Sequence, residues 1–191
     1  MTFWEQFVFI VNKIARTKQV KSCYGQILEI YFNIVYFYKK FTFRNKKYSY
    51  FYHSYNITFF DERTVEIPIF AELVSSYKNK RILEVGNVLS NYFKVDYDIV
   101  DKYDQAPGVI NQDVVTYKTN KKYELIISIS TLEHVGWDEV PRKPQKIFAA
   151  MKNLKNLLTP HGFLIASIPL GYNSYLDTLL KKEKIGFNKQ Y

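Results

Sequence analysis

The sequence predicts an α/β fold built on an open, mostly parallel sheet of about five strands, with a helical extension at the N-terminus. Short apolar runs that end on a glycine or a carboxylate recur from about residue 80 onward, as buried parallel strands do. Apolar residues at helical spacing stand between the last two runs. Strands that alternate with helices or loops are typical of a parallel sheet.

Five segments qualify as strands of this sheet. They are residues 82–85, 97–101, 108–113, 123–130 and 162–169. The helix before the last strand is predicted from residues at three- and four-residue spacing: Ile147, Phe148, Met151, Leu154, Leu157 and Leu158. Only about ten residues join the first strand to the second, so a helix in that connection must be very short. A further helix fits residues 175–184.

Charge is distributed unevenly along the 191 residues. Lys and Arg number 27 against 18 Asp and Glu, and the first 60 residues hold 9 of the basic and 2 of the acidic side chains. The net charge of +9 is therefore +7 in the first third and +2 in the rest. A hydrophobic fraction of 47% is enough for a buried core and excludes the composition of a disordered chain.

Cysteine and histidine usage excludes two classes of site. The single cysteine, Cys23, rules out an intramolecular disulfide and a cysteine-based zinc site, and the three scattered histidines lack metal-ligand spacing. We therefore expect no bound metal and a reducing, cytoplasmic location. Polar residues interrupt the apolar start and no small-residue cleavage site follows, so no signal peptide is predicted.

The first 47 residues are predicted to form a basic, amphipathic helical extension. Apolar residues repeat at helical spacing in 3–14, and 24–38 is a second, more apolar helix that is too short to span a bilayer. Three interpretations stay open: a helical cap on the main domain, docking on an anionic membrane, and binding to nucleic acid. A general bias toward Lys, Asn and aromatic residues weakens the two specific interpretations, and nucleic acid is the least favoured.

Residues 48–80 are predicted to form an entry loop and a helix, and residues 81–191 the main domain. The apolar stripe of that helix is expected at Val65, Ile69, Leu73 and Val74. Four residues in or near the loop are candidates to line a pocket, although capping and ion pairing are more common roles for each. They are His53, Asn56, Arg63 and Glu66.

Polar residues gather where the predicted strands end. They are Glu84, Gly86 and Asn87 at the first strand, Asp101 at the second, Asp113 at the third, and Ser130, Thr131, Glu133 and His134 at the fourth. Ligands of open parallel sheets bind outside these carboxyl ends. Two successive strands that each end on Asp, downstream of an E-x-G turn, indicate a ligand site rather than helix capping.

In this order the segments resemble the class I S-adenosylmethionine-dependent methyltransferases, in particular the small-molecule type 11 group. The resemblance covers roughly residues 81–173. LEVGN is similar to the first motif, IVD to the acidic end of the second strand, and the run from NQD to STLEHV to the segment that ends on the fourth strand. LKNLLTPHGFLIASIP is similar to the last helix, turn and strand. The resemblance implies a Rossmann-like fold with strand order 3-2-1-4-5, the cofactor S-adenosylmethionine and methyl transfer.

The resemblance also implies roles for individual residues. Those expected around the cofactor are Glu84, Gly86 and Asn87 at its methionine part, Asp101 at the ribose hydroxyls, Asp113 at the adenine amino group, and Leu132 and Glu133 beside the methyl group. His134 is the candidate general base, because imidazole titrates near neutral pH. The residues expected to line the acceptor pocket are Trp137, Gly171, Tyr172 and Asn173.

The sequence departs from the family pattern in two places. The family has a glycine-rich E-x-G-x-G-x-G turn, whereas Gly86 is followed by Asn-Val-Leu-Ser. The family also closes its sheet with two further strands, whereas at most one fits after residue 184, so a C-terminally short domain and a sheet edge open to a dimer partner are expected. The alternative to an enzyme is therefore a non-catalytic binding or scaffold module of the same fold. A dinucleotide-dependent oxidoreductase is disfavoured, because a pyrophosphate needs a G-x-G-x-x-G turn.

Absent motifs narrow the class of methyl acceptor. The Asp/Asn-Pro-Pro-Tyr pattern of enzymes that methylate nucleic acid amino groups is missing after the fourth strand. The predicted catalytic domain contains no cysteine, which excludes the covalent route to carbon-5 of a pyrimidine. A small-molecule, sugar or lipid-linked acceptor is therefore expected.

Overall fold

The computed structural model describes residues 18–191, and it describes side chains from Tyr24 onward. The chain divides into two compact units, residues 1–69 and 70–191. The predicted helix at residues 3–14 lies outside the described residues. The predicted divisions 1–47, 48–80 and 81–191 stay a prediction.

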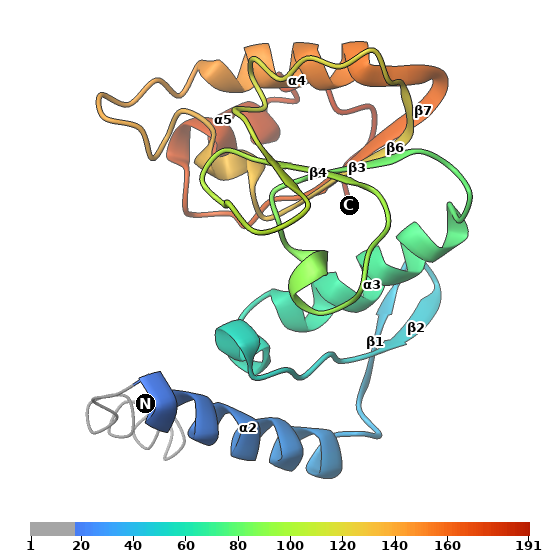
Figure 1. Cartoon of the computed structure of the whole chain (residues 1–191), viewed down its shortest axis with the longest axis vertical. Coiled ribbons are helices and arrows are strands. Elements are labelled where there is room, and N and C mark those ends of the chain that lie inside the picture. Colours follow the sequence, from blue (N-terminus) through green and yellow to red (C-terminus); the bar gives the residue numbers. More distant parts are fainter. Residues whose placement is uncertain (1–17) are drawn as a thin grey trace. The chain divides into compact units, whose positions relative to one another are not determined.

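The first unit contains helix α2 (Lys18–Val35), a two-stranded hairpin and the short 3-10 helix η1 (Tyr55–Phe60) (Figure 1). One face of α2 packs on the segment that follows the hairpin. Phe32 stacks on Phe59 with 5.0 Å between ring centroids, and Glu29 accepts a hydrogen bond of 2.7 Å from the Ser54 amide. The opposite face of α2 carries the exposed residues Ile27, Ile30 and Ile34. The helix is therefore apolar on two sides.

The predicted extension is not wholly helical, because its basic C-terminal flank forms a β-hairpin. Strand β1 (Lys40–Phe43) pairs antiparallel with β2 (Lys46–Ser49), with Phe43 opposite Lys46. The two turn residues, Arg44 and Asn45, both have positive φ values of 48° and 62°. This two-residue turn with left-handed backbone matches the right-handed twist of paired strands. The short alternation around Phe41 and Phe43 was the sequence signal for it.

The second unit contains the five-stranded parallel sheet, and its strand order confirms the predicted fold class (Figure 1). The strands are β3 (Ile82–Val85), β4 (Asp98–Asp101), β5 (Val109–Asn111), β6 (Tyr123–Ile129) and β7 (Leu158–Ser167). Their spatial order is β5-β4-β3-β6-β7, and all four pairings are parallel. In chain order this is 3-2-1-4-5, so β3 and β6 lie in the middle of the sheet.

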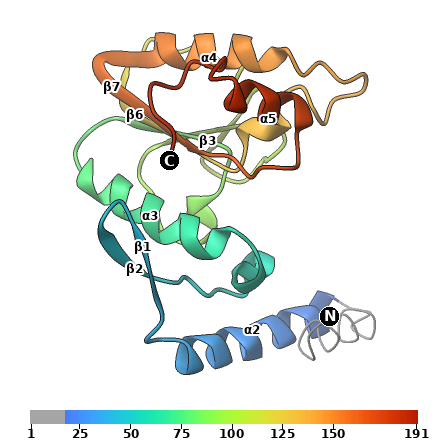
Figure 2. The ribbon, with the colours of Figure 1, turned by 180° about the vertical axis from the view of Figure 1, so that it is seen from behind.

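The main core lies between this sheet and helices α4 (Lys146–Leu157) and α5 (Ser174–Lys181), which Figure 2 shows from behind. Leu83, Val85 and Ile126 come from the two central strands, and Leu154 and Leu176 come from the two helices. Burying a side chain of this size contributes roughly 1.5–3 kcal/mol. The central strands are therefore fixed from within, and the carboxyl ends that follow them have defined positions.

Several predicted boundaries differ from the structure. β7 begins at Leu158 rather than at residue 162, because Leu158 pairs with Tyr123 before a register shift. Helix α3 (Arg63–Ser76) exists, but its most buried apolar residues are Ile67 and Phe70 rather than the predicted stripe. The connection between β3 and β4 contains only the 3-10 helix η2 (Leu89–Asn91), as its length predicted. Within residues 18–191, no helix is both long and apolar enough to cross a lipid bilayer.

Candidate active site at the carboxyl ends of the strands

The turn after β3 closes tightly on the loop after β6. Gly86 has a φ of +89°, a left-handed conformation that side chains with a Cβ rarely adopt. A Cβ on Gly86 would also overlap Oγ1 of Thr131 and lie 2.8 Å from its Cγ2. Gly86 is thus required both by its backbone and by the packing of Thr131. The contact brings the first strand's turn against the fourth strand's loop.

Glu84 stabilises this turn through hydrogen bonds to its backbone. Its side chain is fully buried, and Oε1 accepts hydrogen bonds of 2.9 Å from the amides of Val88 and Leu89. Oε2 accepts a third hydrogen bond of 2.9 Å from the hydroxyl of Tyr97, and burial raises the pKa of that hydroxyl. The carboxylate therefore stabilises the shape of a turn that contains a single glycine. Its predicted contact with the cofactor stays a prediction, and its bonds within the protein give it a structural role.

Asp101 ends β4 and connects three backbone segments. Oδ1 accepts hydrogen bonds from the amides of Tyr103 and Asp104, at 2.7 and 2.8 Å. Oδ2 accepts a longer bond of 3.2 Å from the Asn87 amide, and the Asn87 side chain donates to Asp104 at 2.8 Å. A carboxylate offers about four lone-pair positions. These bonds leave Asp101 with acceptor capacity on Oδ2 for one further donor.

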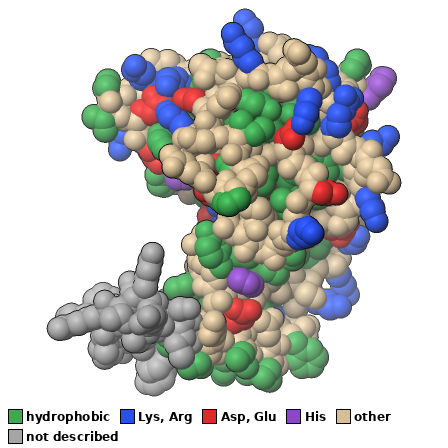
Figure 3. Space-filling view, in the orientation of Figure 1, with side chains coloured by type: hydrophobic (Ala, Val, Ile, Leu, Met, Phe, Trp, Pro, Cys, Tyr) green, Lys and Arg blue, Asp and Glu red, His purple; other side chains and the backbone are tan. Residues whose placement is uncertain are grey.

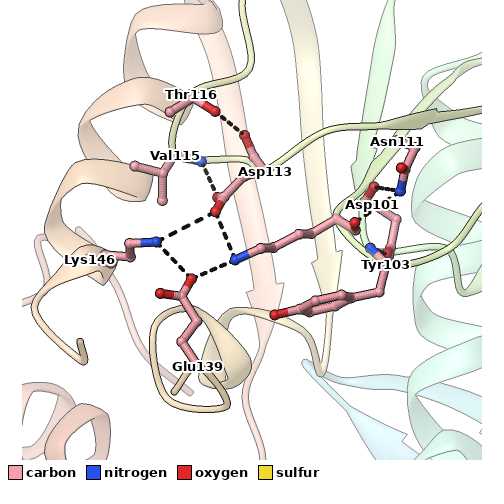
Figure 4. A network of polar contacts seen from close by, with 9 residues as sticks. Asp101, Tyr103, Asn111, Asp113, Val115, Thr116, Glu139 and Lys146 are labelled. Carbon is pink, nitrogen blue, oxygen red and sulfur yellow. Dashed lines mark hydrogen bonds and ion pairs between the residues drawn. The ribbon is translucent and has the colours of Figure 1, made fainter. Parts of the chain in front are cut away.

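Asp113 belongs to a network of alternating charges that Figure 4 shows in close-up. Its Oδ2 lies 3.1 Å from Nζ of Lys102 and 3.7 Å from Nζ of Lys146. Glu139 contacts the same two ammonium groups, at 2.6 and 2.7 Å. Hydrogen bonds to Lys102 and Lys146 lower the pKa of Glu139. An adenine amino group would have to compete with these lysines for Asp113.

The loop after β6 is polar and partly exposed. It begins with the 3-10 helix η3 (Leu132–His134), in which Leu132 and Glu133 are buried and His134 is 41% exposed. Nδ1 of His134 lies 2.6 Å from Oδ2 of Asp138, whereas Nε2 lies 3.5 Å from Oε1 of Glu133. His134 therefore has one short hydrogen bond and a second ring nitrogen that faces a carboxylate at longer range.

Tyr172 joins His134 from the segment between β7 and α5. Its hydroxyl donates to both carboxylate oxygens of Asp138, at 2.8 and 3.0 Å, and its ring centroid lies 4.7 Å from that of His134. The hydrogen bond to Asp138 raises the pKa of the Tyr172 hydroxyl, which keeps it a donor. The structure thus brings two predicted site residues, His134 and Tyr172, into contact around Asp138. We call these three residues the His134 cluster.

The other residues predicted for the acceptor pocket have different surroundings. Asn173 is buried, with its amide donating to the Glu133 carbonyl at 2.7 Å and its Oδ1 accepting from the Leu176 amide at 3.0 Å. It caps helix α5, which gives it a structural role, and its assignment to the acceptor pocket stays a prediction. The guanidinium of Arg142 lies 4.5 Å from the ring centroid of Trp137. The Gly171 amide donates to Asp177 at 3.0 Å.

Sequence reasoning missed the partners that define both charged clusters. Asp138 stands four residues after His134, a spacing at which a turn brings two side chains together, so this partner had a signal. Lys102 follows Asp101 directly, but nothing in the sequence connects it to Glu139, 37 residues away. Among residues 18–191, no group of three His, Cys, Asp or Glu side chains is arranged to hold a metal ion.

These groups fit S-adenosylmethionine at one end of the site better than at the other. Asp101 retains an acceptor position suited to a ribose hydroxyl. The Cβ side of Gly86 is instead covered by Thr131, and the Gly86 amide donates to the Val100 carbonyl at 2.9 Å. The amides of Val88 and Leu89 are used by Glu84, and Asp113 is used by two lysines. Of the residues that the family resemblance assigns to the cofactor, Asp101 therefore keeps an open acceptor position, whereas Glu84 and Asp113 are bonded within the protein.

No family model matches the chain, and no curated protein matches it. Among solved structures, the N-methyltransferase NodS from Bradyrhizobium japonicum, in complex with S-adenosyl-L-homocysteine, is 15% identical with a TM-score of 0.37, over 55% of this chain and 64% of that one. The CcbJ methyltransferase from Streptomyces caelestis is 15% identical with a TM-score of 0.35, over 51% of this chain and 46% of that one.

A third structure, an S-adenosylmethionine-dependent methyltransferase from Clostridium acetobutylicum, is 17% identical with a TM-score of 0.40, over 76% of this chain and 57% of that one. The match spans less than two thirds of each of these three solved chains. The fold assignment rests on the strand order and the parallel registers of the sheet.

Proposed function

We propose that this chain is an S-adenosylmethionine-dependent methyltransferase that acts on a small-molecule, sugar or lipid-linked acceptor. The observation that carries the proposal is the place of the His134 cluster. It lies in the loop after central strand β6, three residues from Thr131, which packs on the Gly86 turn after central strand β3. Ligands of open parallel sheets bind at these carboxyl ends, and a proton acceptor there could take the proton that a methyl acceptor loses.

Asp101 would hold the cofactor through Oδ2, and Gly86 shapes the turn beside it. When bound, S-adenosylmethionine supplies a methyl group on a positively charged sulfur. Transfer from such a group depends mainly on orientation of the acceptor and on removal of its proton. The loops after β6 and β7, which carry Trp137 and Tyr172, would orient the methyl acceptor.

His134 is the residue that we assign to proton removal. A hydrogen bond to an ionised carboxylate places the ring proton on Nδ1, which leaves a lone pair on Nε2. Nε2 can then accept a proton from a hydroxyl or amine acceptor. The imidazolium so formed lies near two carboxylates, Asp138 at 2.6 Å and Glu133 at 3.5 Å, which stabilise its charge.

Calorimetric titration of the full chain with S-adenosylmethionine and S-adenosylhomocysteine tests the proposal. We expect both to bind, and we expect Asp101→Ala to weaken binding by about 2 kcal/mol, the value of a hydrogen bond to a charged group. Asp96→Ala is the matched control, because Asp96 is an exposed carboxylate just before β4. If neither compound binds at millimolar concentration, the enzyme proposal fails and the non-catalytic module of the same fold takes its place.

We also propose a cytoplasmic location with peripheral membrane contact through α2. Ile27, Ile30 and Ile34 lie on its outer face and are 59%, 61% and 66% exposed. Figure 3 shows Lys and Arg side chains, in blue, on the visible face of the chain. The full chain should co-sediment with vesicles of anionic lipid, and the double substitution Ile30→Asp, Ile34→Asp should abolish this. Equal sedimentation of both proteins contradicts the proposal.

Pairing of a second copy along the sheet edge is a further proposal. In the described part of the chain, β7 lies at one end of the strand order, so its outer backbone groups have no strand partner in that sheet. Phe163 on this strand is 57% exposed. Sedimentation equilibrium should give a dimer that Phe163→Lys weakens, and a monomer at all concentrations contradicts it.

A further inference from the structure

We propose that Asp138 and Tyr172 are positioning residues that fix His134 as the Nδ1–H tautomer, which leaves the Nε2 lone pair to take up the acceptor's proton. The proposal rests on the proposed function, in which His134 removes the acceptor's proton. Neither Asp138 nor the pairing of Tyr172 with it follows from the family resemblance. Both come from the geometry of the His134 cluster.

The contact between His134 and Asp138 determines where the ring proton lies. An ionised carboxylate has only acceptor positions, so the 2.6 Å contact requires a proton on Nδ1. In a neutral imidazole the other nitrogen, Nε2, is then without a proton. The tautomer of the neutral ring is thus set by Asp138, since which nitrogen is free depends on the bond that the other one makes.

Tyr172 fixes Asp138 in turn. Its hydroxyl donates to both oxygens of the carboxylate, at 2.8 and 3.0 Å, so rotation of the Asp138 side chain would break two contacts. The tilted ring of Tyr172 lies 4.7 Å from His134 and limits rotation of the imidazole. The carboxylate is therefore held between the two rings, each of which donates to it.

A buried hydrogen bond joins the two chain segments that carry these side chains. Asn173 follows Tyr172, Glu133 precedes His134, and the Asn173 amide donates to the Glu133 carbonyl at 2.7 Å. Asn173 is itself fixed as the N-cap of α5. An exposed ion pair formed by side chains alone has no such support, and it contributes little to order. The cluster is built on a buried connection between β6 and α5.

The charged groups that face His134 support the assigned direction of proton transfer. Asp138 lies on the Nδ1 side and Glu133 on the Nε2 side, and the ring of Tyr172 lies beside the imidazole at an interplanar angle of 60°. The proton that leaves the acceptor would move to Nε2, while the Nδ1 proton stays in its bond to Asp138. The resulting imidazolium has a carboxylate on each side, so no further group has to move to balance its charge.

Nitrogen-15 NMR of the histidine rings in the full chain tests the tautomer without any substrate. The chain has three histidines, His53, His134 and His161, and single His→Gln variants assign their signals. Above neutral pH we expect His134 to show a protonated Nδ1 and an unprotonated Nε2. His53 is an internal reference of the opposite kind, because its Nδ1 accepts a hydrogen bond of 3.0 Å from the Tyr55 amide.

Asp138→Ala should release the ring, so the two His134 nitrogen signals should move toward each other as the tautomers exchange. Tyr172→Phe keeps the ring contact and removes the hydroxyl, so a smaller shift in the same direction is expected. Asp96→Ala should leave the pattern unchanged. A wild-type His134 with its proton on Nε2, or a pattern that Asp138→Ala does not alter, overturns the proposal.

Turnover supplies a second readout once an acceptor is found among simple amines and alcohols. Asp138→Ala should lower kcat roughly tenfold to a hundredfold, within the range of general base catalysis, with KM for S-adenosylmethionine unchanged. A rise in KM with unchanged kcat would contradict a positioning role. Failure of the wild-type chain to bind S-adenosylhomocysteine would overturn the methyltransferase proposal alone, since the NMR result decides the tautomer independently.

Discussion

The turn after β3 and the loop after β6 lie side by side at the same edge of the sheet, yet they use their carboxylates in opposite ways. Glu84 is fully buried, and it accepts hydrogen bonds from two amides of its own turn and from Tyr97. Asp138 is 38% exposed and bonds two side chains that themselves reach solvent. The first carboxylate builds the scaffold, and the second directs a reactive group.

The turn after β3 contains a single glycine, and hydrogen bonds to Glu84 stabilise its shape. Glycine-rich turns use conformational freedom to expose backbone amides to a ligand. Here a buried carboxylate collects two of those amides, which fixes the turn and withdraws them from a ligand. Chemistry is therefore expected at the loop after β6, and the turn after β3 is left with the left-handed Gly86 and with Asp101 beside it.

The largest effect is expected at the scaffold carboxylate. Glu84→Ala leaves two amides and a hydroxyl without their acceptor in a buried site, and we expect it to lower the free energy of unfolding of the second unit by about 4 kcal/mol. Chemical denaturation followed by tyrosine and tryptophan fluorescence measures this. Asp138→Ala is the comparison variant, and its cost should be under about 1 kcal/mol, because the pair is exposed. Equal costs for the two would remove the distinction between scaffold and site.

A smaller effect is expected where the two regions touch. Gly86→Ala combines a left-handed backbone with overlap onto Thr131, and we expect a loss of about 2–3 kcal/mol in the free energy of unfolding. Thr131→Ala removes the overlapping hydroxyl and methyl group but not the backbone strain. The double variant should therefore recover part of the loss. If the two losses simply add, Thr131 does not pack on Gly86, and the contact between turn and loop is wrong.

The smallest effects concern the ion pairs, and their pH dependence separates a network from an isolated pair. Glu139→Gln should cost about 1 kcal/mol at neutral pH, because its carboxylate joins two lysines. The pKa of Glu139 is lowered in the folded chain, so this contribution is present above the ordinary Glu pKa of about 4.3 and is lost as the pH falls below it. Denaturation at pH 7 should show the full loss in the free energy of unfolding relative to wild type, and denaturation at pH 3 should show a smaller loss.

Glu124→Gln is the matched control for that experiment. Glu124 pairs with Arg81 at 2.9 Å outside the site, and the hydrogen bond to Arg81 lowers the pKa of Glu124 to about 2. The contribution of Glu124 to stability depends on pH in the same direction as that of Glu139. It is present above the ordinary Glu pKa of about 4.3 and is lost as the pH falls toward 2. Because the pair is exposed, its effect at pH 7 should be smaller than that of Glu139 and should vanish in high salt. An effect of equal size would mean that the network adds nothing to its separate pairs.

The sequence predicted the sheet because each strand is a short buried run whose identity does not depend on distant residues. The positions of Asp101 and His134 at the strand ends follow from that pattern, whereas the order of the strands was implied by the family resemblance. The hairpin at residues 40–49 was missed because its basic residues outweighed the alternation of Phe41 and Phe43. Composition shows which segment is rich in basic residues, and it does not show whether that segment forms a helix or a hairpin.

The site was predictable in its residues and not in their partners. Glu84 and Asp113 stand where the family pattern predicts ligand contacts, but the hydrogen bonds of Glu84 and the lysines around Asp113 are set by tertiary structure. Lys102 and Glu139 are brought together by the loop after β6 and have no signal in spacing. The sequence shows which chemical groups stand at the strand ends, and the folded structure shows which of them already bond to other groups of the protein.

The most direct measurement of the central claim is the amide NMR spectrum of the full chain titrated with S-adenosylhomocysteine. We predict that signals shift at Gly86 and Asn87, at Asp101, and in Leu132–His134, while those of the hairpin at residues 40–49 stay in place. This pattern would locate the cofactor between the scaffold turn and the His134 loop. An unchanged spectrum at millimolar concentration, or shifts confined to residues 18–60, would contradict the account.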